Sequence, residues 1–406
     1  MTSHAAVPKT KTKKQKSFKR PLLGMLALVF VFSLGLNIGK GNIALNKQAS
    51  VSKDLPADLD YSSVEAIYDR LRQNYDGDLD QQAFLDGLKQ GLTTATGDPY
   101  TEYFNVKDAK AFDEELSGSF TGIGAELGKR QTGGIEVISP IGGFPAEKAG
   151  LKAKDLILEI NGESGATLTI SQAVDKIRGE AGTKVKLKVL RGVDQQLDFE
   201  ITRAQITVPS VKSEILEGNV GLLTISRFGP DTAQLAREAA ASFKKAGVTK
   251  VVLDMRSNPG GLLDAAVDVS GLWLDASQVV LQEKRDGKVI KSFYGTTNPV
   301  LKDIKTVVLI NEGSASASEI TAGALKDNKI ATLIGTKSYG KGSVQQLQHL
   351  PDGSLLKITS AHWFTPSGNG IDKIGIEPDQ KVAISDEDIK ASKDPQKDAA
   401  LAFLNK

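Results

Sequence analysis

The sequence predicts a multidomain protein of mixed α+β and α/β class, with an N-terminal helical segment, a small β-rich domain and an α/β core. Its 406 residues suggest two to three domains at about 150 residues each. Apolar residues recur at helical spacing near residue 65, alternate with polar ones over 118–204, and form short continuous runs after residue 248. Charged residues at 25% and hydrophobic residues at 40% exclude wholesale disorder.

The first residues carry a membrane-targeting pattern. Residues 1–20 hold seven basic residues and no acidic one, and an apolar run from Leu22 to Ile38 follows. This run is at the short end for a membrane-spanning helix, so we expect a single-pass signal-anchor over 21–39. Basic flanks stay inside, so residues 1–20 are expected in the cytoplasm and the body of the chain outside it. A cleaved signal peptide is the alternative, although no clear A-x-A site follows. The apolar run disfavours a nucleic-acid arm.

A linker over residues 40–56 precedes an N-terminal helical region, residues 57–117. The linker is polar and has no periodicity. A first helix is expected at SSVEAIYDRLRQNY, where Ser62 and Glu65 have the spacing of a capping box. A second is expected at DLDQQAFLDGLKQGLTTATGD. Both helices have one apolar face, which is typical of a packing or dimerisation element. A homo-oligomer is therefore left open.

Residues 118–204 read as short strands with two helical pieces. In GIGAEL, a Gly-x-Gly turn before an open strand points backbone N–H groups into one hollow, which suits the carboxylate of a peptide terminus. A tight turn is the simpler interpretation of this motif alone. Together with SPIGGFPAEKAGLKAKDLILEINGE, however, the stretch resembles a PDZ domain. That resemblance implies capture of peptide C-termini by Gly122, Ile123, Gly124 and Ala125.

The core, residues 205–406, contains three apolar runs that predict buried parallel strands: VTKVVLDM, IKTVVLIN and IATLIGT. A helix is expected between the last two. The carboxyl ends of parallel strands meet at one edge of a sheet, where ligands usually bind. The runs are followed by RSNPGG, EGSASAS and KSYGKGS, respectively. Glycines, serines and lysines are thus expected to converge at that edge.

A serine at this edge needs a base to become a nucleophile. The chain has no cysteine and three histidines, of which His349 and His362 flank a predicted hairpin. Thiolate metal sites and a cysteine nucleophile are therefore excluded, and no H-E-x-x-H signature is present. A lysine can replace histidine when burial keeps it neutral. Helix-capping serines and a solvated or phosphate-binding lysine loop stay open as alternatives, although TKSYGKGSV lacks the P-loop spacing.

Four motifs resemble the carboxy-terminal processing peptidases, or tail-specific proteases: SNPGGLL, NEGSASASEITAGALKDN, GTKSYGKGSVQQ and TPSGNGIDKIGIEPD. The resemblance covers about residues 57–385 and implies a crotonase-like α/β peptidase core. It places the nucleophile at Ser316, the general base at Lys341 and a residue that orients the lysine at Gln345. Asn369 departs from the family, which often has a basic residue there.

The resemblance further implies an oxyanion hole made by the backbone N–H of Ala317 and that of Gly260 or Gly261. It implies a serine endopeptidase that recognises protein or peptide substrates by their free C-termini and needs no metal or cofactor. Arg178, at the end of SQAVDKIRG, is a candidate regulatory contact between the PDZ domain and the core, with a solvated charge at the helix end as the alternative. The alternative functions are a non-catalytic PDZ tail-binding module and a crotonase-like acyl-thioester enzyme.

Overall fold

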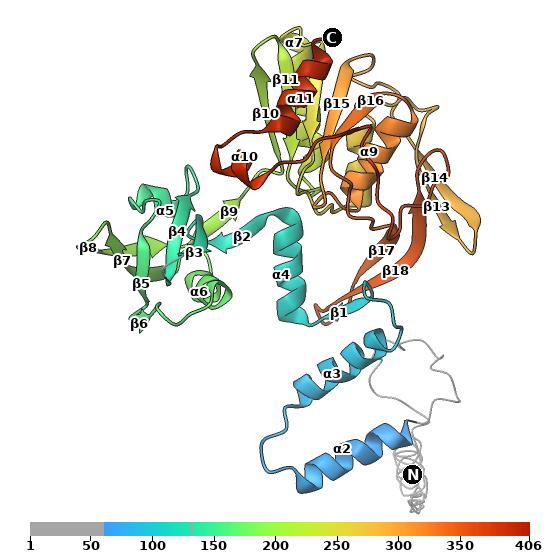
Figure 1. Cartoon of the computed structure of the whole chain (residues 1–406). Helices are drawn as coiled ribbons and strands as arrows, with labels where there is room; N and C mark the ends of the chain where they lie inside the picture. The colour runs from blue at the N-terminus through green and yellow to red at the C-terminus, as the bar shows by residue number, and fades with distance from the viewer. Residues whose placement is uncertain (1–60, 131–132) are drawn as a thin grey trace, which may run out of the picture. The chain divides into compact units, whose positions relative to one another are not determined.

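The structure is a computed structural model that describes residues 61–130 and 133–406. The chain divides into two compact units, residues 1–80 and 81–406, and Figure 1 shows the order of the elements along it. The predicted tail, signal-anchor and linker lie outside the described residues. Within the described ranges, no helix is both long and apolar enough to cross a bilayer.

The described part of the first unit contains helix α2, Ser62–Asn74, which confirms the first predicted helix. Tyr61 occupies the N-cap and its side chain makes no capping hydrogen bond, so the capping role expected of Ser62 is wrong. The reason is local, because the helix begins at Ser62 itself rather than after it. No residue of α2 is buried.

The second unit begins with helix α3, Gln81–Thr94, which matches the second predicted helix. The segment after it holds a strand and a helix that the sequence pattern did not reveal, β1 (Glu102–Phe104) and α4 (Val106–Ser117). Strand β1 pairs antiparallel with β18 (Leu355–Phe364) of the core. A strand of three residues is too short to show the alternation typical of strands. It forms by pairing with a partner about 250 residues away, which a local sequence pattern does not reveal.

The β-rich domain has the predicted strands and two helices. Its sheet has the order β3-β4-β5-β7-β8, with β6 paired to β5. The predicted alternation in β7 is confirmed, because Val185, Leu187 and Val189 are fully buried. The elements are β3 (Ala125–Lys129), β4 (Ile135–Pro140), α5 (Pro145–Lys148), β5 (Leu156–Ile160), β6 (Glu163–Ser164), α6 (Ile170–Ile177), β7 (Lys184–Arg191) and β8 (Gln195–Thr202).

A two-stranded ribbon leads into and out of this domain. Strand β2, Ser119–Gly122, pairs antiparallel with β9, Ala204–Thr207. Arg227 of the core donates hydrogen bonds from Nη2 to the carbonyl oxygens of Ser117 (2.8 Å) and Val208 (2.7 Å). One guanidinium group therefore binds the segments that flank both strands at the base of the ribbon.

The core contains a six-stranded sheet in the order β10-β11-β12-β15-β16-β19. Strands β11, β12, β15, β16 and β19 run parallel to one another, which confirms the three predicted strands and adds two more. The strands are β10 (Val211–Leu216), β11 (Val220–Ile225), β12 (Lys250–Asp254), β15 (Lys305–Ile310), β16 (Ala331–Gly335) and β19 (Gln380–Lys381).

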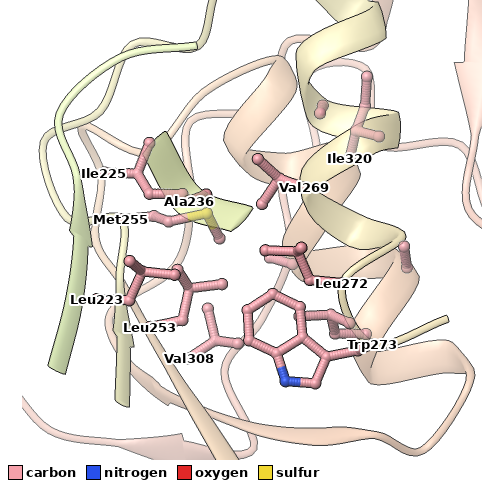
Figure 2. Close-up of a cluster of buried hydrophobic side chains, with 14 of the residues drawn as sticks. Leu223, Ile225, Ala236, Leu253, Met255, Val269, Leu272, Trp273, Val308 and Ile320 are labelled. Carbon is pink, nitrogen blue, oxygen red and sulfur yellow. The ribbon is translucent and has the colours of Figure 1, made fainter. Parts of the chain in front are cut away.

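Helices cover both faces of this sheet. On one face, residues such as Leu253 and Val308 share a buried cluster with Trp273, as Figure 2 shows. Residues of helices α7 (Thr232–Lys245), α8 (Leu263–Ser270) and α9 (Ala317–Asp327) belong to the same cluster. On the other face, Val252 and Leu309 pack against α11 (Pro395–Leu404). Strands buried on both faces read as continuous apolar runs, which explains the pattern of the sequence.

A second, five-stranded sheet carries the segment that follows the GKG motif. Its path is β1-β18-β13-β14, and β17 pairs with β18 as the predicted hairpin. The remaining elements are β13 (Val279–Arg285), β14 (Lys288–Tyr294), β17 (Ser343–His349) and the short helix α10 (Asp386–Lys390).

Candidate active site

The loops that follow β12, β15 and β16 meet at the carboxyl edge of the parallel sheet. The N–H of Ala315 donates to the carbonyl of Asn258 at 3.0 Å, and the N–H of Tyr339 donates to the carbonyl of Ser314 at 3.0 Å. These bonds join the first loop to the second and the second to the third. The convergence predicted from the strand pattern is therefore observed.

A cavity of about 600 Å³ opens at this edge. Ser316, Lys341 and Gln345 all line it, as do Gly260 and Gly261. Much of its remaining wall is apolar, contributed by Leu262, Leu263, Ile320, Val344, Leu347 and Trp363. Helix α4 contributes Phe112, Glu115 and Leu116. The structure thus brings together the residues expected to do chemistry in a largely apolar hollow.

Ser316 is held in a strained backbone conformation at the N-terminus of α9. Its φ of 53° and ψ of −114° lie where residues other than glycine are rare. Such a conformation costs roughly 1–3 kcal/mol and persists only where the surroundings enforce it. Gly260 is one enforcing neighbour, because a Cβ on it would lie 2.8 Å from Ser316 Cβ and 2.7 Å from the Ala315 carbonyl oxygen.

Glu319 connects the loop that holds Ser316 to the loop that holds Lys341. Its carboxylate is fully buried and accepts hydrogen bonds from the N–H of Ser316 (2.8 Å), the hydroxyl of Ser338 (2.6 Å), the N–H of Gly340 (2.7 Å) and the N–H of Lys341 (3.0 Å). The sequence interpretation did not identify this residue. The S-x-x-E spacing from Ser316 to Glu319 was the signal, because it is the pattern of a capping box.

The two serines that flank Ser316 have structural roles. Ser314 donates from Oγ to the Met255 carbonyl at 2.8 Å, and Ser318 donates to the Asn258 carbonyl at 2.9 Å. Both are fully buried. Ser316 is only half-buried, and it alone of the three lines the cavity.

Lys341 is half-buried, and its Nζ lies 5.0 Å from the centre of the Tyr100 ring. Burial lowers the pKa of Lys341 below its ordinary value of 10.5, and the charge of Lys357 lowers it further. Glu102, Asp98 and Glu319 act in the opposite direction on the pKa of Lys341 but leave it depressed. The main-chain carbonyl of Lys341 is fixed by a hydrogen bond of 3.0 Å from Trp363 Nε1. A lysine in this environment gives up its proton more easily than one in water.

Gln345 lines the same cavity, but its side chain forms its hydrogen bonds with residues other than Lys341. Its Nε2 donates to Ser343 Oγ at 2.8 Å and to Thr359 Oγ1 at 3.4 Å. Among the described residues, the structure records no hydrogen bond between Gln345 and Lys341. The role implied for Gln345, orienting the lysine, stays a prediction.

The expected oxyanion donors differ in their hydrogen bonding. The N–H of Gly260 donates to Asn258 Oδ1 at 2.9 Å, and Asn258 Nδ2 donates to the Ile225 carbonyl at 2.8 Å. In the described part of the chain, the N–H groups of Gly261 and Ala317 have no backbone or side-chain acceptor. Asn258, fully buried and not identified from the sequence, therefore fixes the shape of this glycine turn.

The two histidines in the described part of the chain, His349 and His362, do not line the cavity. His349, at the end of β17, has a side chain that is more than half exposed, with Nε2 3.7 Å from Asp113 Oδ1, and His362 on β18 is exposed. Over residues 61–130 and 133–406, no group of three or more His, Asp or Glu side chains is arranged to hold a metal ion. Asn369, where the sequence departs from the family pattern, donates to Ser367 Oγ at 3.0 Å.

The Gly-Ile-Gly turn of the β-rich domain has the polarity expected of a carboxylate cradle. The carbonyls of Ile123 and Gly124 accept hydrogen bonds from Ala146 (2.7 Å) and Ile141 (2.9 Å). Their own N–H groups have no acceptor among the residues that the structure places. Strand β3, which follows and begins at Ala125, is at the edge of its sheet, and α6 packs beside it.

Arg178 lies next to this turn. Its Cγ is 3.9 Å from the position that a Cβ on Gly122 would occupy, and its guanidinium carbon lies 4.8 Å from the centre of the Phe120 ring. Its Nη1 forms an ion pair with Glu114 of α4 at 3.4 Å. Arg178 thus joins the α6 end of the β-rich domain to the helix that lines the cavity.

Comparisons with known proteins agree with this architecture. The model of peptidase family S41 matches residues 219–382, and the PDZ domain model matches residues 136–191. The "Carboxy-terminal processing protease CtpA" of Bacillus subtilis (strain 168) is 38% identical over 347 residues, which is 85% of this chain and 73% of the relative. The "Probable CtpA-like serine protease" of Staphylococcus haemolyticus is 37% identical over 364 residues, which is 89% of this chain and 71% of the relative.

A solved structure shares the fold. An S41-type protein from Bacteroides fragilis NCTC 9343 aligns with 84% of this chain and 97% of its own, with a TM-score of 0.56 and 19% identity. At that identity the likeness supports the fold alone, whereas the two sequence relatives support the family. The chain belongs to the S41 peptidases and is a serine-type carboxy-terminal processing protease that carries a PDZ domain.

Proposed function

We propose that the protein is an endopeptidase that recognises substrates by their C-terminal tails and cleaves them with a Ser316–Lys341 dyad. One observation carries the catalytic part of the proposal: Ser316 and Lys341 line the same cavity while both their backbone N–H groups bind the buried carboxylate of Glu319. The nucleophile and its base are therefore attached to one anchor.

The chemistry follows from the two side chains. Neutral Lys341 takes the hydroxyl proton of Ser316, and Oγ attacks the scissile carbonyl carbon. The resulting oxyanion would accept hydrogen bonds from the N–H groups of Ala317 and Gly261, because the N–H of Gly260 is already donated to Asn258 Oδ1. The carbon–nitrogen bond then breaks as protonated Lys341 gives its proton to the leaving amine. Water attacks the acyl-enzyme, Lys341 takes a proton from it, and Ser316 recovers its hydrogen as the carboxylate product leaves.

The test is proteolysis of an unfolded protein substrate by Ser316→Ala and Lys341→Ala. Each variant is expected to lose cleavage almost completely, because the two residues act as one unit. The matched control is Lys337→Ala, a lysine of the same loop that pairs with Glu377 and does not line the cavity. It should keep full activity. An active Lys341→Ala variant would refute the dyad.

Tail recognition is proposed at the edge of strand β3. An incoming peptide would add as a strand between β3 and α6, and its carboxylate would accept hydrogen bonds from the N–H groups of Ile123 and Gly124. A peptide with a free C-terminus should therefore bind well, and its amidated twin should bind much more weakly. Equal affinities in a titration of the isolated full-length enzyme would remove the carboxylate role from residues 122–125.

Arg178 is proposed to couple tail binding to the cavity. A carboxylate bound beside Gly122 would compete with Glu114 for the guanidinium of Arg178, and this would loosen the hold on α4. A ligand shifts such an equilibrium only as far as it prefers one state. Arg178→Ala should therefore reduce the stimulation of cleavage by an added tail peptide. The control Lys176→Ala removes the neighbouring cation, which pairs with Glu163 instead.

Membrane attachment is also proposed, from the sequence pattern of residues 1–39. Residues 22–38 would anchor the chain, with the catalytic part outside the cytoplasm. A chain that starts at residue 41 should remain in the supernatant after ultracentrifugation, while the full chain sediments with membranes. External protease should digest residues 57–406 in spheroplasts, and protection of that region would show the orientation to be wrong.

A further inference from the structure

A second lysine lines the catalytic cavity. Lys357 of β18 forms part of the same wall as Lys341. Its Nζ forms an ion pair with Glu102, the residue directly opposite it on β1. The Lys357 side chain is only 15% exposed, so its charge is poorly screened by water.

The position of the Lys357 ammonium is fixed from several sides. It lies 5.3 Å from the centre of the Phe104 ring on β1 and 5.8 Å from that of Phe112 on α4. Cation–π contacts and the ion pair hold this group in place. The amino group of Lys357 is thus fixed in the wall of the hollow in which Lys341 must be neutral.

Charged groups on several segments act on Lys341, and Asp372 lies nearby, where it accepts a hydrogen bond from the Gly342 N–H at 3.2 Å. Lys357 lies on β18, Glu102 on β1, Asp98 in the segment before β1 and Glu319 on α9. The ring of Tyr100 lies under Nζ of Lys341. Burial raises the pKa of Tyr100 above its ordinary value of 10.0, so its phenol stays protonated at neutral pH. The other charged groups in the cavity wall are Glu115 and Arg227.

We propose that the Lys357–Glu102 pair sets the pH range in which Lys341 can serve as the general base, which makes both members positioning residues for catalysis. This inference rests on the proposed Ser–Lys mechanism. The cation of Lys357 opposes a proton on Lys341, and the anion of Glu102 favours it. Removing either partner leaves the other uncompensated, so the two removals act in opposite directions.

The experiment compares pH profiles of kcat/KM for a small unstructured peptide. Lys357→Met is expected to move the rising limb to higher pH, which lowers kcat/KM about three- to tenfold at a fixed pH on that limb. Glu102→Gln is expected to move it to lower pH, with a gain of similar size at the same fixed pH. The double variant Lys357→Met/Glu102→Gln should return close to the wild-type profile, and Lys357→Arg should keep it.

Lys89→Met is the matched control. Lys89 also forms an ion pair, with Asp352 at 2.7 Å, and lies 5.0 Å from the centre of an aromatic ring, that of Tyr103, but it is outside the cavity. The Lys89→Met variant should leave the midpoint of the pH profile unchanged. Thermal melts accompany each variant. The midpoint of the pH profile, unlike the rate, does not depend on the fraction of enzyme that is folded. It can therefore be compared even for a destabilised variant.

The outcomes separate this inference from the proposed function. If Lys341→Ala is inactive and both single variants leave the midpoint unchanged, or shift it in the same direction, the role of the pair is refuted and the dyad stands. If Lys341→Ala is active, the dyad itself fails. Opposite shifts that cancel in the double variant support the inference, because a purely structural role would lower rates without moving the midpoint.

Discussion

The buried carboxylate of Glu319 accepts a hydrogen bond of 3.0 Å from the backbone N–H of Lys341. The same carboxylate accepts one of 2.8 Å from the N–H of Ser316. Because α9 and the loop after β16 are separate segments, this side chain helps to fix how the backbones of Ser316 and Lys341, the proposed nucleophile and base, are placed relative to each other. The geometry of the proposed dyad therefore depends on a residue that takes no part in the proposed bond changes.

Glu319→Gln should inactivate the enzyme and destabilise it. An amide offers one acceptor oxygen, and its NH₂ group would face backbone donors, so buried N–H groups would lose their partners at about 1–3 kcal/mol each. We expect kcat to fall at least about a hundredfold, as misplaced catalytic groups commonly cause. Urea unfolding and steady-state kinetics measure both effects. Glu312→Gln, in the exposed part of the neighbouring loop, is the control, and equal kinetics for the two variants would contradict the anchoring role.

Ser316→Gly should unfold at a higher denaturant concentration than Ser316→Ala, although both variants are inactive. The φ of 53° at this position strains any residue with a Cβ, at roughly 1–3 kcal/mol, and glycine removes that strain. The greater flexibility of glycine in the unfolded chain offsets up to about 1 kcal/mol of the gain. Paired urea curves measure the difference, and a less stable glycine variant would show that the backbone of Ser316 is not strained.

Activity should rise with pH because the base must be neutral. Burial depresses the pKa of Lys341 below 10.5, so the neutral form, and with it kcat/KM, increases through a midpoint below that of an ordinary lysine. The sign is fixed: at low pH the lysine carries its proton and cannot accept another. Stopped assays from pH 6 to pH 10 measure the profile. A flat profile, with chemistry shown to limit the rate, would exclude a lysine base.

Gly260→Ala should abolish cleavage. Gly260 has a φ of 100°, and a Cβ added to it would lie 2.8 Å from Ser316 Cβ, so there is no room for a methyl group. Gly287→Ala is the matched control, because Gly287 also has a positive φ, of 75°, but has open space around it. The control carries only the backbone strain and should remain active. Circular dichroism and peptide cleavage distinguish the two, and an active Gly260→Ala variant would refute the tight contact with the nucleophile.

Local patterns in the sequence determined much of the fold. Continuous apolar runs predicted β12, β15 and β16, and strict alternation predicted strands such as β7, because the burial of a strand on one or both faces is recorded in its own residues. The same logic brought the glycine, serine and lysine loops to one edge. The motifs around Ser316 and Lys341 added the family, which the sequence relatives support.

Tertiary structure alone decided which distant groups surround the dyad. Glu102 and Lys357 are paired across β1 and β18, Tyr100 lies under Lys341, and Asn258 holds the N–H of Gly260. No local period encodes these contacts, since they join segments far apart in the chain or depend on where a buried side chain finds its hydrogen-bond partner. The sequence therefore determined the chemical groups of the site, and long-range packing determined the desolvation and the neighbouring charges that depress the pKa of Lys341.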